Sequence, residues 1–357
     1  MSLLTILLIP VISLIIVLAI MPLLRIIALK VHLVDKPNAR KAHKGQVPLI
    51  GGLAIFFATF ASVLVAAPSW QSIHTISFML IAAGILLLIG VIDDKADLRA
   101  SLKLTIQIAL AYFAFINGFR IETFYGIFGI YEIPIFAQYV ITVFVITGVV
   151  NAFNLMDGID GLAAGLAFIA FALFGWMAFL TGQYMLLSLF LSLIGALIGF
   201  MRFNFSTKVK VFMGDAGSLF IGLIMVLSAI SLLQAAQGTS DIQLVLSVVV
   251  GVLALPVFDS LRVYRRRAKN GYSPFRADRT HFHHLVLQLG IKQRSATLLI
   301  ITISGLLIAL SIAIGTITSL TLVIISLILA FIGISWMLSL NSRVLYWKEK
   351  VLKMEKS

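Results

Sequence analysis

Six aspartates stand where this chain changes from apolar to polar: Asp93, Asp94, Asp157, Asp160, Asp215 and Asp259. Each lies at the end of a long apolar segment, and an ionised side chain beside hydrocarbon is costly enough that it is usually kept for a function. Carboxylate oxygens are preferred ligands of Mg²⁺, which commonly acts on phosphates. Acids gathered on one aqueous face therefore indicate a divalent cation and a phosphorylated substrate.

The pair Asp93 and Asp94 ends an apolar segment in the sequence VIDDK. A helix C-terminus carries partial negative charge, so acids are unfavourable there. Adjacent carboxylates also repel each other, by roughly 4 kcal/mol at about 4 Å with an effective dielectric constant near 20. Either Lys95, Lys103 and solvent compensate for this repulsion, or the pair serves as a metal ligand, a base or both.

A second acidic motif, NAFNLMDGIDG, has an Asn or Asp at every third position: Asn151, Asn154, Asp157 and Asp160. Residues three apart are neighbours on a helix, so each successive pair shares a face. Gly158 and Gly161 are expected to break that helix, and an Asx-Gly turn is the simpler alternative. Four Asx residues with apolar sequence on both sides favour a site.

The third motif is FMGDAGS, in which Asp215 begins another apolar segment. An Asp at this place is a good helix N-cap, which is one reading. The other makes Asp215 a metal ligand, with the flanking glycines allowing backbone N–H groups to approach a phosphate.

The segment after Asp259 is rich in arginine and histidine: Arg265, Arg266, Arg267, Arg279, His281, His283 and His284. The histidine spacing does not suit one tetrahedral zinc site, and the chain has no cysteine. Phosphate binding or proton transfer is favoured beside so many arginines. An interfacial amphipathic helix without chemistry is the alternative.

The elements that must position these residues are membrane helices, because 61% of the 357 residues are hydrophobic and only 11% are charged. Soluble domains carry about 25% charged residues, and a span needs about 20 apolar residues. We predict an all-α integral membrane protein with about eleven transmembrane helices, of which the fourth is the weakest because of Gln107 and Asn117. The predicted spans are 3–29, 47–67, 75–92, 104–117, 135–153, 159–180, 184–201, 216–236, 242–261, 296–315 and 318–340.

The basic residues predict the orientation of these spans. With the N-terminus outside, every Lys and Arg except Arg120 falls on the side where the acids lie, which is the positive-inside pattern. The formal charge of +13 then becomes a basic cytoplasmic face that attracts phosphates. We expect one domain, 1–340, with cytoplasmic loops 30–46, 93–103, 202–215 and 262–295, and a basic cytoplasmic tail, 341–357. The first span has no basic leader or cleavage site and is expected to be retained.

Taken together, IDDK, NAFNLMDGIDGLAAG, FMGDAGS, HFHHLVLQLG and the segment RKAHKGQVPLIGG beginning at Arg40 resemble the polyprenyl-phosphate N-acetylhexosamine-1-phosphate transferase family. The likeness runs from about residue 30 to 290. The HFHHLVLQLG segment is similar to the WecA/TagO branch, which uses UDP-GlcNAc, and differs from the branch that transfers MurNAc-pentapeptide phosphate.

The resemblance implies transfer of GlcNAc-1-phosphate from UDP-GlcNAc to undecaprenyl phosphate in a cytoplasm-facing cleft of a bacterial cytoplasmic membrane, with release of UMP. It implies Mg²⁺ as cofactor, with Mn²⁺ as an alternative. Membrane lipids are expected partners, a homodimer is left open, and no nucleic acid is expected. The same reaction with another UDP-N-acetylhexosamine or with the MurNAc-pentapeptide donor is the alternative. An ion-coupled transporter is the alternative from another class, although transporters place their acids near the bilayer midplane.

The resemblance also suggests roles for single residues. Asp215 and Asp94 would bind the metal, and Asp93 or Asp94 would act on the acceptor phosphate as base or orienting group. Asn154, Asp157 and Asp160 would line the nucleotide side, with Asp157 and Asp160 counted among the catalytic acids. The arginines and histidines after Asp259 would hold the nucleotide-sugar phosphates. The lipid phosphate would be bound by His43, Lys44 and Lys103.

Overall fold

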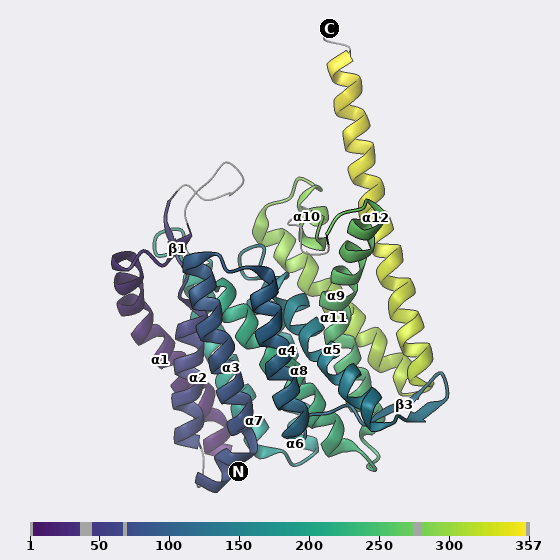
Figure 1. Cartoon of the computed structure of the whole chain (residues 1–357). Coiled ribbons are helices and arrows are strands. Elements are labelled where there is room, and N and C mark those ends of the chain that lie inside the picture. Colours follow the sequence, from purple (N-terminus) through teal and green to yellow (C-terminus); the bar gives the residue numbers. More distant parts are fainter. Residues whose placement is uncertain (1–2, 36–44, 67–69, 274–279, 355–357) are drawn as a thin grey trace.

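The computed structural model of this chain is a bundle of long helices that run roughly side by side (Figure 1). It describes residues 3–35, 45–66, 70–273 and 280–354. The helices are α1 (Leu3–Lys30), α2 (Gly51–Ala66), α3 (Trp70–Ala96), α4 (Ala100–Ile116), α5 (Ile135–Asn154), α6 (Leu162–Leu180), α7 (Tyr184–Asn204), α8 (Gly214–Ala236), α9 (Ile242–Lys269), α10 (Phe282–Leu287), α11 (Gln293–Gly315) and α12 (Leu320–Met354).

Within the described residues, nine helices are long and apolar enough to cross a membrane, and α2 and α4 are shorter apolar helices. This is the pattern of a multi-pass membrane protein, as predicted. The predicted count of eleven spans and their orientation in the membrane stay predictions. Figure 1 places the N-terminus at one end of the bundle and the C-terminus beyond the other.

Helix α8 is the centre of the bundle. It packs against α2, α3, α5, α6 and α9, and nearly all of its side chains are buried. Helices α1 and α12 lie at the periphery, where most side chains of their apolar windows are not buried. In a membrane protein such outward apolar faces contact lipid, so the polar start of α8 is the place where a site can be enclosed by protein.

The weakest predicted span, α4, is held by a polar contact inside the bundle. Gln107 is buried, and its amide oxygen accepts a hydrogen bond from the side chain of Asn151 on α5. Polar side chains between membrane helices find partners in this way instead of facing lipid. Gln107 therefore supports the packing of α4, and Asn151, the first residue of the NAFNLMDGIDG motif, faces that helix.

Two small hairpins depart from the predicted all-α fold: β1 (Val34–Asp35) pairs with β2 (Val47–Pro48), and β3 (Thr123–Ile127) pairs with β4 (Ile130–Glu132). The first leads into an isolated parallel bridge between Leu49 and Phe212, and the backbone N–H of Gly51 donates to Phe212 O at 2.9 Å. The segment that enters α2 is thereby tied to the segment that enters α8.

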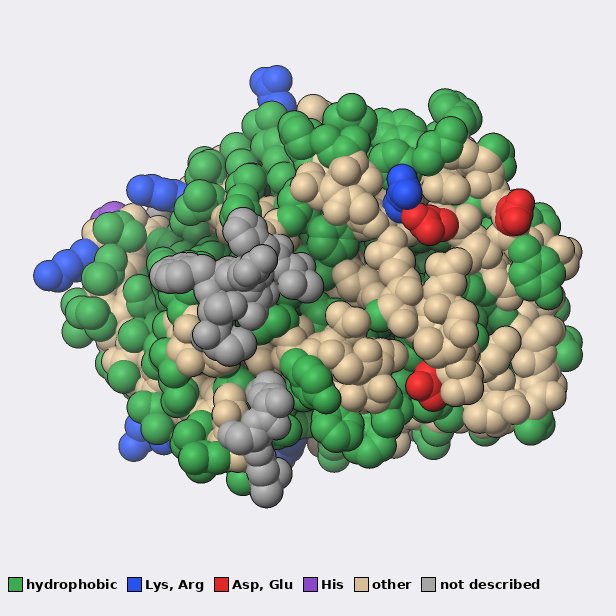
Figure 2. Space-filling model, turned by 90° about the horizontal axis from the view of Figure 1, so that it is seen from below, with side chains coloured by type: hydrophobic (Ala, Val, Ile, Leu, Met, Phe, Trp, Pro, Cys, Tyr) green, Lys and Arg blue, Asp and Glu red, His purple; other side chains and the backbone are tan. Residues whose placement is uncertain are grey.

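The end of the bundle that carries the β3–β4 hairpin is poor in charge. Figure 2 shows this end as a surface of mostly apolar and uncharged groups with few acidic or basic side chains. The acidic motifs lie at the other end, at the close of α3 and the start of α8. The acidic motifs are thus gathered at one end of the bundle, and the orientation of that end in the membrane stays a prediction.

Candidate active site at the polar end of the bundle

A cavity of about 870 Å³ opens at the polar end of the bundle. Its lining includes seven aspartates and three lysines, which gives a formal charge of −4 when His284 is neutral. These charged residues are Asp35, Asp93, Asp94, Asp97, Asp157, Asp160, Asp215, Lys95, Lys103 and Lys210. Three of the four sequence motifs therefore bring their acids to one cavity, and the fourth brings His284.

Asp94, in the last turn of α3, caps the start of α8. Its Oδ1 accepts a hydrogen bond from the backbone N–H of Asp215 at 2.9 Å, and its Oδ2 accepts one from Ala216 at 3.3 Å. An acid is unfavourable at a helix C-terminus but favourable at an N-terminus, so α8 compensates for the charge at the end of α3. Asp215 itself lies in the first turn of α8 and does not cap it.

Gly214 makes this close approach feasible. It has φ = +75°, a left-handed conformation that favours glycine, and a Cβ there would overlap the Asp94 carboxylate. The glycine of the FMGDAGS motif is thus explained by the backbone turn and by the neighbouring acid.

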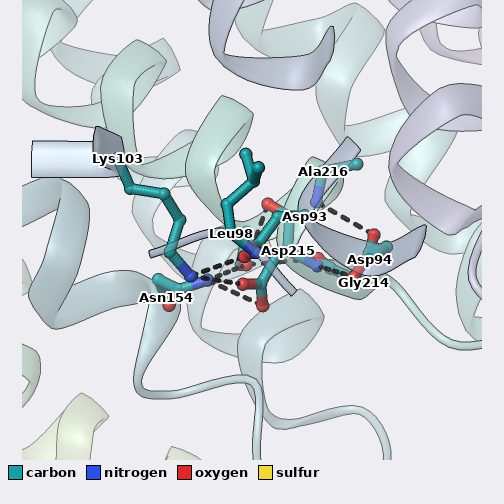
Figure 3. A network of polar contacts seen from close by, with 9 residues as sticks. Asp93, Asp94, Leu98, Lys103, Asn154, Gly214, Asp215 and Ala216 are labelled. Atoms are coloured by element: carbon teal, nitrogen blue, oxygen red, sulfur yellow. Dashed lines mark hydrogen bonds and ion pairs between the residues drawn. The ribbon is translucent and has the colours of Figure 1, made fainter. Parts of the chain in front are cut away.

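Asp93 is buried and makes different contacts from Asp94. Its Oδ1 accepts from the backbone N–H of Leu98 at 2.8 Å, and its Oδ2 forms an ion pair of 2.5 Å with Lys103 on α4. The Lys103 ammonium also lies 3.5 Å from the Asp215 carboxylate. Lys103 therefore bridges the acids of α3 and α8, and Figure 3 shows this network.

Asp215 lines the cavity with a partly exposed carboxylate. Its side chain is 38% exposed, and its Oδ1 accepts a long bond of 3.2 Å from Asn154. The Asn154 amide donates a shorter bond, 2.8 Å, to Ser218 one turn along α8. Asn154 thus joins the end of α5 to the start of α8 and orients Asp215 toward the cavity (Figure 3).

The turn 155–161 breaks the helix between α5 and α6, as the two glycines of its motif predict. Asp160 pairs with Lys210 at 2.6 Å, and its backbone oxygen accepts from Thr297 on α11 at 2.7 Å. Asn204 accepts from the backbone N–H of Gly161 at 2.6 Å and donates to Val211 O at 2.9 Å. This turn is therefore fixed from three sides.

Asp157 lies in the same turn, is half-buried and lines the cavity. Burial, together with the charges of Asp215 and Asp160, raises the pKa of the Asp157 carboxyl to about 7. A carboxylate that titrates near neutrality and faces a charged cavity is typical of a functional site.

The histidines of residues 281–284 take three separate places. His281 forms a contact of 3.0 Å with the Asp259 carboxylate. His283 is buried against Gly158, where burial lowers the pKa of its ring to about 3 and keeps it neutral. Only His284 lines the cavity.

The other predicted phosphate-binding residues lie apart from the cavity lining or outside the described residues. Arg265 and Arg266 are exposed on the last turns of α9, which continues to Lys269 where a loop was predicted. Arg267 is buried, with its guanidinium 5.9 Å from the Tyr264 ring. The described residues do not include His43, Lys44 or Arg279.

Several cavity residues were missed by sequence reasoning. Asp35, Asp97, Asn204, Lys210 and Gln293 all line the cavity. Each is a single polar residue in a polar segment, so no periodicity or apolar neighbourhood distinguished it. Only the contacts between distant segments reveal their place.

The donor set of the cavity fits a Mg²⁺ ion held partly by substrate. Among the residues that the structure describes, no three acidic or histidine side chains converge tightly enough to hold a metal alone. Mg²⁺ is usually bound through one or two carboxylates, with waters and substrate phosphates as the remaining ligands. Asp215 and Asp157 offer carboxylate oxygens to a cavity whose lining has a net negative charge, which favours a bound cation.

Known proteins of similar sequence identify the family of this chain. The family model described as glycosyl transferase family 4 matches residues 75–233. The chain is 34% identical over 298 residues to an undecaprenyl-phosphate alpha-N-acetylglucosaminyl 1-phosphate transferase of Yersinia pestis, which covers 82% of this chain and 79% of the relative. It is 35% identical over 297 residues to the protein of that name from Escherichia coli strain K12, covering 81% and 78%.

A third relative comes from a distant bacterium. The chain is 34% identical over 298 residues to a probable undecaprenyl-phosphate N-acetylglucosaminyl 1-phosphate transferase of Bacillus subtilis strain 168, covering 81% of this chain and 79% of the relative. The family match at residues 75–233 includes the acids of α3, of the turn 155–161 and of α8. The resemblance seen in the motifs is thus confirmed, and the chain belongs to the polyprenyl-phosphate N-acetylhexosamine-1-phosphate transferase family, within glycosyl transferase family 4.

Proposed function

We propose that this protein transfers GlcNAc-1-phosphate from UDP-GlcNAc to undecaprenyl phosphate and releases UMP. The observation that carries the proposal is the acidic cavity at the polar end of the bundle, which Asp215 lines with a carboxylate that is 38% exposed. The names of its relatives specify the same donor sugar and the same lipid acceptor.

The position of the cavity suits one soluble and one membrane-bound substrate. The acids lie at the ends of α3 and α8, where a lipid phosphate can reach them while its hydrocarbon chain stays in the bilayer. A nucleotide sugar enters from the aqueous side. We place this side in the cytoplasm of a bacterial cell, and the membrane is then the cytoplasmic membrane.

Mg²⁺ would be held by Asp215 and by a second acid, Asp157 or Asp94, together with the donor diphosphate. When bound, it would neutralise charge on the diphosphate and on the phosphoryl group in transfer. Both oxygens of Asp94 already accept backbone hydrogen bonds, so Asp157, which also lines the cavity, is the better candidate for the second ligand.

Lys103 and Asp93 suit the acceptor side of the cavity. The Lys103 ammonium is half-buried between two carboxylates, and a third anion, the lipid phosphate, can approach its exposed face. Asp93 fixes the position of this ammonium through the 2.5 Å ion pair. An orienting role for Asp93 therefore accounts for its burial better than a role as base.

Direct attack is the chemistry that these contacts favour. An oxygen of the lipid phosphate forms a bond to the sugar-linked phosphorus of the donor. The bond from that phosphorus to the bridging oxygen breaks, and UMP departs with the electron pair. The lipid phosphate already carries the negative charge of a nucleophile, and Asp93, Asp94 and Asp160 are each engaged in a hydrogen bond or an ion pair, so direct attack needs no covalent aspartyl intermediate.

The experiment is an assay of UMP release by purified protein with UDP-GlcNAc and undecaprenyl phosphate. We expect turnover with Mg²⁺, loss of turnover with EDTA, and recovery when Mg²⁺ or Mn²⁺ is restored. Parallel reactions with other UDP-N-acetylhexosamines and with UDP-MurNAc-pentapeptide identify the donor. If no donor gives UMP and the protein instead drives ion-coupled solute uptake in vesicles, it is a transporter and not the proposed transferase.

A further inference from the structure

Asp259 is a fully buried acid that the proposed chemistry leaves without a task. It lies inside α9, one turn after Pro256, and its side chain is 0% exposed. It is absent from the cavity lining. Burying a carboxylate is costly unless it is paired and hydrogen-bonded, so its partners indicate what it is for.

Those partners all serve the start of α10. Asp259 Oδ1 accepts from Arg262 Nη2 at 2.6 Å and from the backbone N–H of Phe282 at 3.0 Å. Its Oδ2 lies 3.0 Å from His281 Nδ1. Arg262 also donates to the backbone oxygen of Thr280 at 2.5 Å. One acid and one arginine on α9 thus hold three successive residues that lie about twenty positions further along the chain.

From this anchor, a chain of ring contacts leads to the cavity. The rings of His281 and His283 are parallel within 5°, with centroids 6.0 Å apart. The centroids of His283 and His284 are 4.2 Å apart. His283 packs so closely on Gly158 that a Cβ there would overlap its ring, and His284 lines the cavity beside that glycine.

Apolar contacts and directional bonds together hold α10. Phe282 is buried and its ring stacks on Phe331 of α12, with centroids 5.8 Å apart, and Leu285 and Val286 are buried as well. Apolar packing is not directional, whereas charge-assisted hydrogen bonds have a preferred geometry. The bonds from Asp259 therefore add a directional constraint at the start of this six-residue helix.

We infer that Asp259 is a positioning residue: through His281 and the backbone of Phe282 it orients residues 281–284 so that His284 meets the donor in the cavity. This inference rests on the proposed function, since it assigns these residues to the nucleotide-sugar side. Asp259 touches no substrate, so its effect reaches the reaction only through the histidines.

The test is the kinetics of Asp259→Asn in the full-length protein. The amide has nearly the same shape and keeps one oxygen for Phe282, but it loses the charge that pairs with Arg262 and His281. We expect KM for UDP-GlcNAc to rise about tenfold, or kcat/KM for the donor to fall by as much, because a small misplacement near the reacting groups has effects of this size. KM for undecaprenyl phosphate should stay within about twofold.

Asp241→Asn is the matched control, because Asp241 stands at the other end of α9 and makes no side-chain cap bond. A double-mutant cycle with His281→Gln then tests the route. If Asp259 acts through His281, Asp259→Asn adds little to the defect of His281→Gln, whereas a purely structural role makes the two defects multiply.

Arg262→Gln is a second variant in case Asp259→Asn does not fold, since it releases Thr280 and leaves Asp259 its contacts to α10. A rise in KM for the donor alone supports the inference. Unchanged kinetics in a folded Asp259→Asn, equal effects on both substrates, or multiplicative defects in the cycle would overturn it. Inactive wild-type protein would count against the proposed function, whereas an active wild type with an unaffected Asp259→Asn counts against this inference alone.

Discussion

The Asp94 carboxylate accepts a hydrogen bond of 2.9 Å from the backbone N–H of Asp215, a residue 121 positions later in the chain. Asp94, at the end of α3, thereby caps the start of α8 and holds the backbone of Asp215, whose side chain lines the cavity. Adjacent residues Asp93 and Asp94 consequently have different tasks, although the sequence presents them as a pair.

Replacement of Asp215 by Asn is predicted to abolish nearly all turnover. The amide keeps the shape of the side chain but offers a weaker ligand to a hard cation and removes charge beside Lys103. The variant should fold, since its side chain is 38% exposed. UMP release and its dependence on Mg²⁺ concentration measure the effect. If more than about a tenth of the activity remains, a loss of less than about 1.4 kcal/mol, Asp215 is not a metal ligand.

Asp93→Asn and Asp94→Asn are predicted to have unlike effects. Asp93→Asn removes the charge that holds Lys103, so we expect a higher KM for undecaprenyl phosphate. Asp94→Ala removes the cap of α8, so we expect the free energy of unfolding to fall by about 1 kcal/mol and turnover to fall as well. Asp94→Asn keeps an oxygen that can accept the hydrogen bond, so we expect it to lose less stability than Asp94→Ala. Kinetics for both substrates and unfolding in detergent distinguish them. Identical defects would contradict the separate tasks.

Gly214→Ala is predicted to damage the site through two effects at once. The alanine is strained at φ = +75°, and its Cβ overlaps the Asp94 carboxylate. Gly129→Ala is the matched control, because Gly129 has φ = +79° and a Cβ added there would meet no other atom within 4 Å. We expect both variants to lose some stability and only Gly214→Ala to lose turnover. Equal turnover in the two variants would show that the overlap is relieved without consequence.

The pH dependence of turnover should contain the titration of Asp157. Burial raises the pKa of Asp157 to about 7, so the carboxylate is increasingly protonated as the pH falls below that value. If its charge is needed, kcat/KM decreases as the pH drops through about 7. A bound cation favours the ionised form, so more Mg²⁺ should move this limb to lower pH. Asp157→Asn should lower activity and remove this decrease of kcat/KM at low pH. If the decrease is unchanged in that variant, it arises from the titration of another group.

The arginines at the end of α9 provide a prediction about donor binding. Arg266 is exposed, whereas Arg267 is buried beside Tyr264. Lysine cannot reproduce the bidentate fork of arginine on a phosphate, so Arg266→Lys should raise KM for UDP-GlcNAc several-fold and leave the lipid KM unchanged. Arg267→Lys should instead lower stability through its lost ring contact. If KM for UDP-GlcNAc is unchanged in Arg266→Lys, this end of α9 is an interfacial basic helix that does not bind the donor.

The sequence by itself determined the membrane class of the protein, the approximate helix boundaries and the acidic motifs at the helix ends. These follow from local properties. The length of an apolar run shows whether it can cross a bilayer. An acid beside such a run is unusual, however the helix packs against its neighbours. Even the turn 155–161 was predictable, because Asx and Gly residues together favour a turn.

Only the tertiary structure decided which side each polar residue faces. Asn151 and Asn154 stand three positions apart in one motif, yet Asn151 binds Gln107 of α4 and Asn154 binds α8. Asp259 resembled the other acids at a span end, yet it lies inside α9 and holds α10. These roles depend on how helices pack against one another, and hydrophobic periodicity in a bundle apolar on nearly every face does not specify that packing.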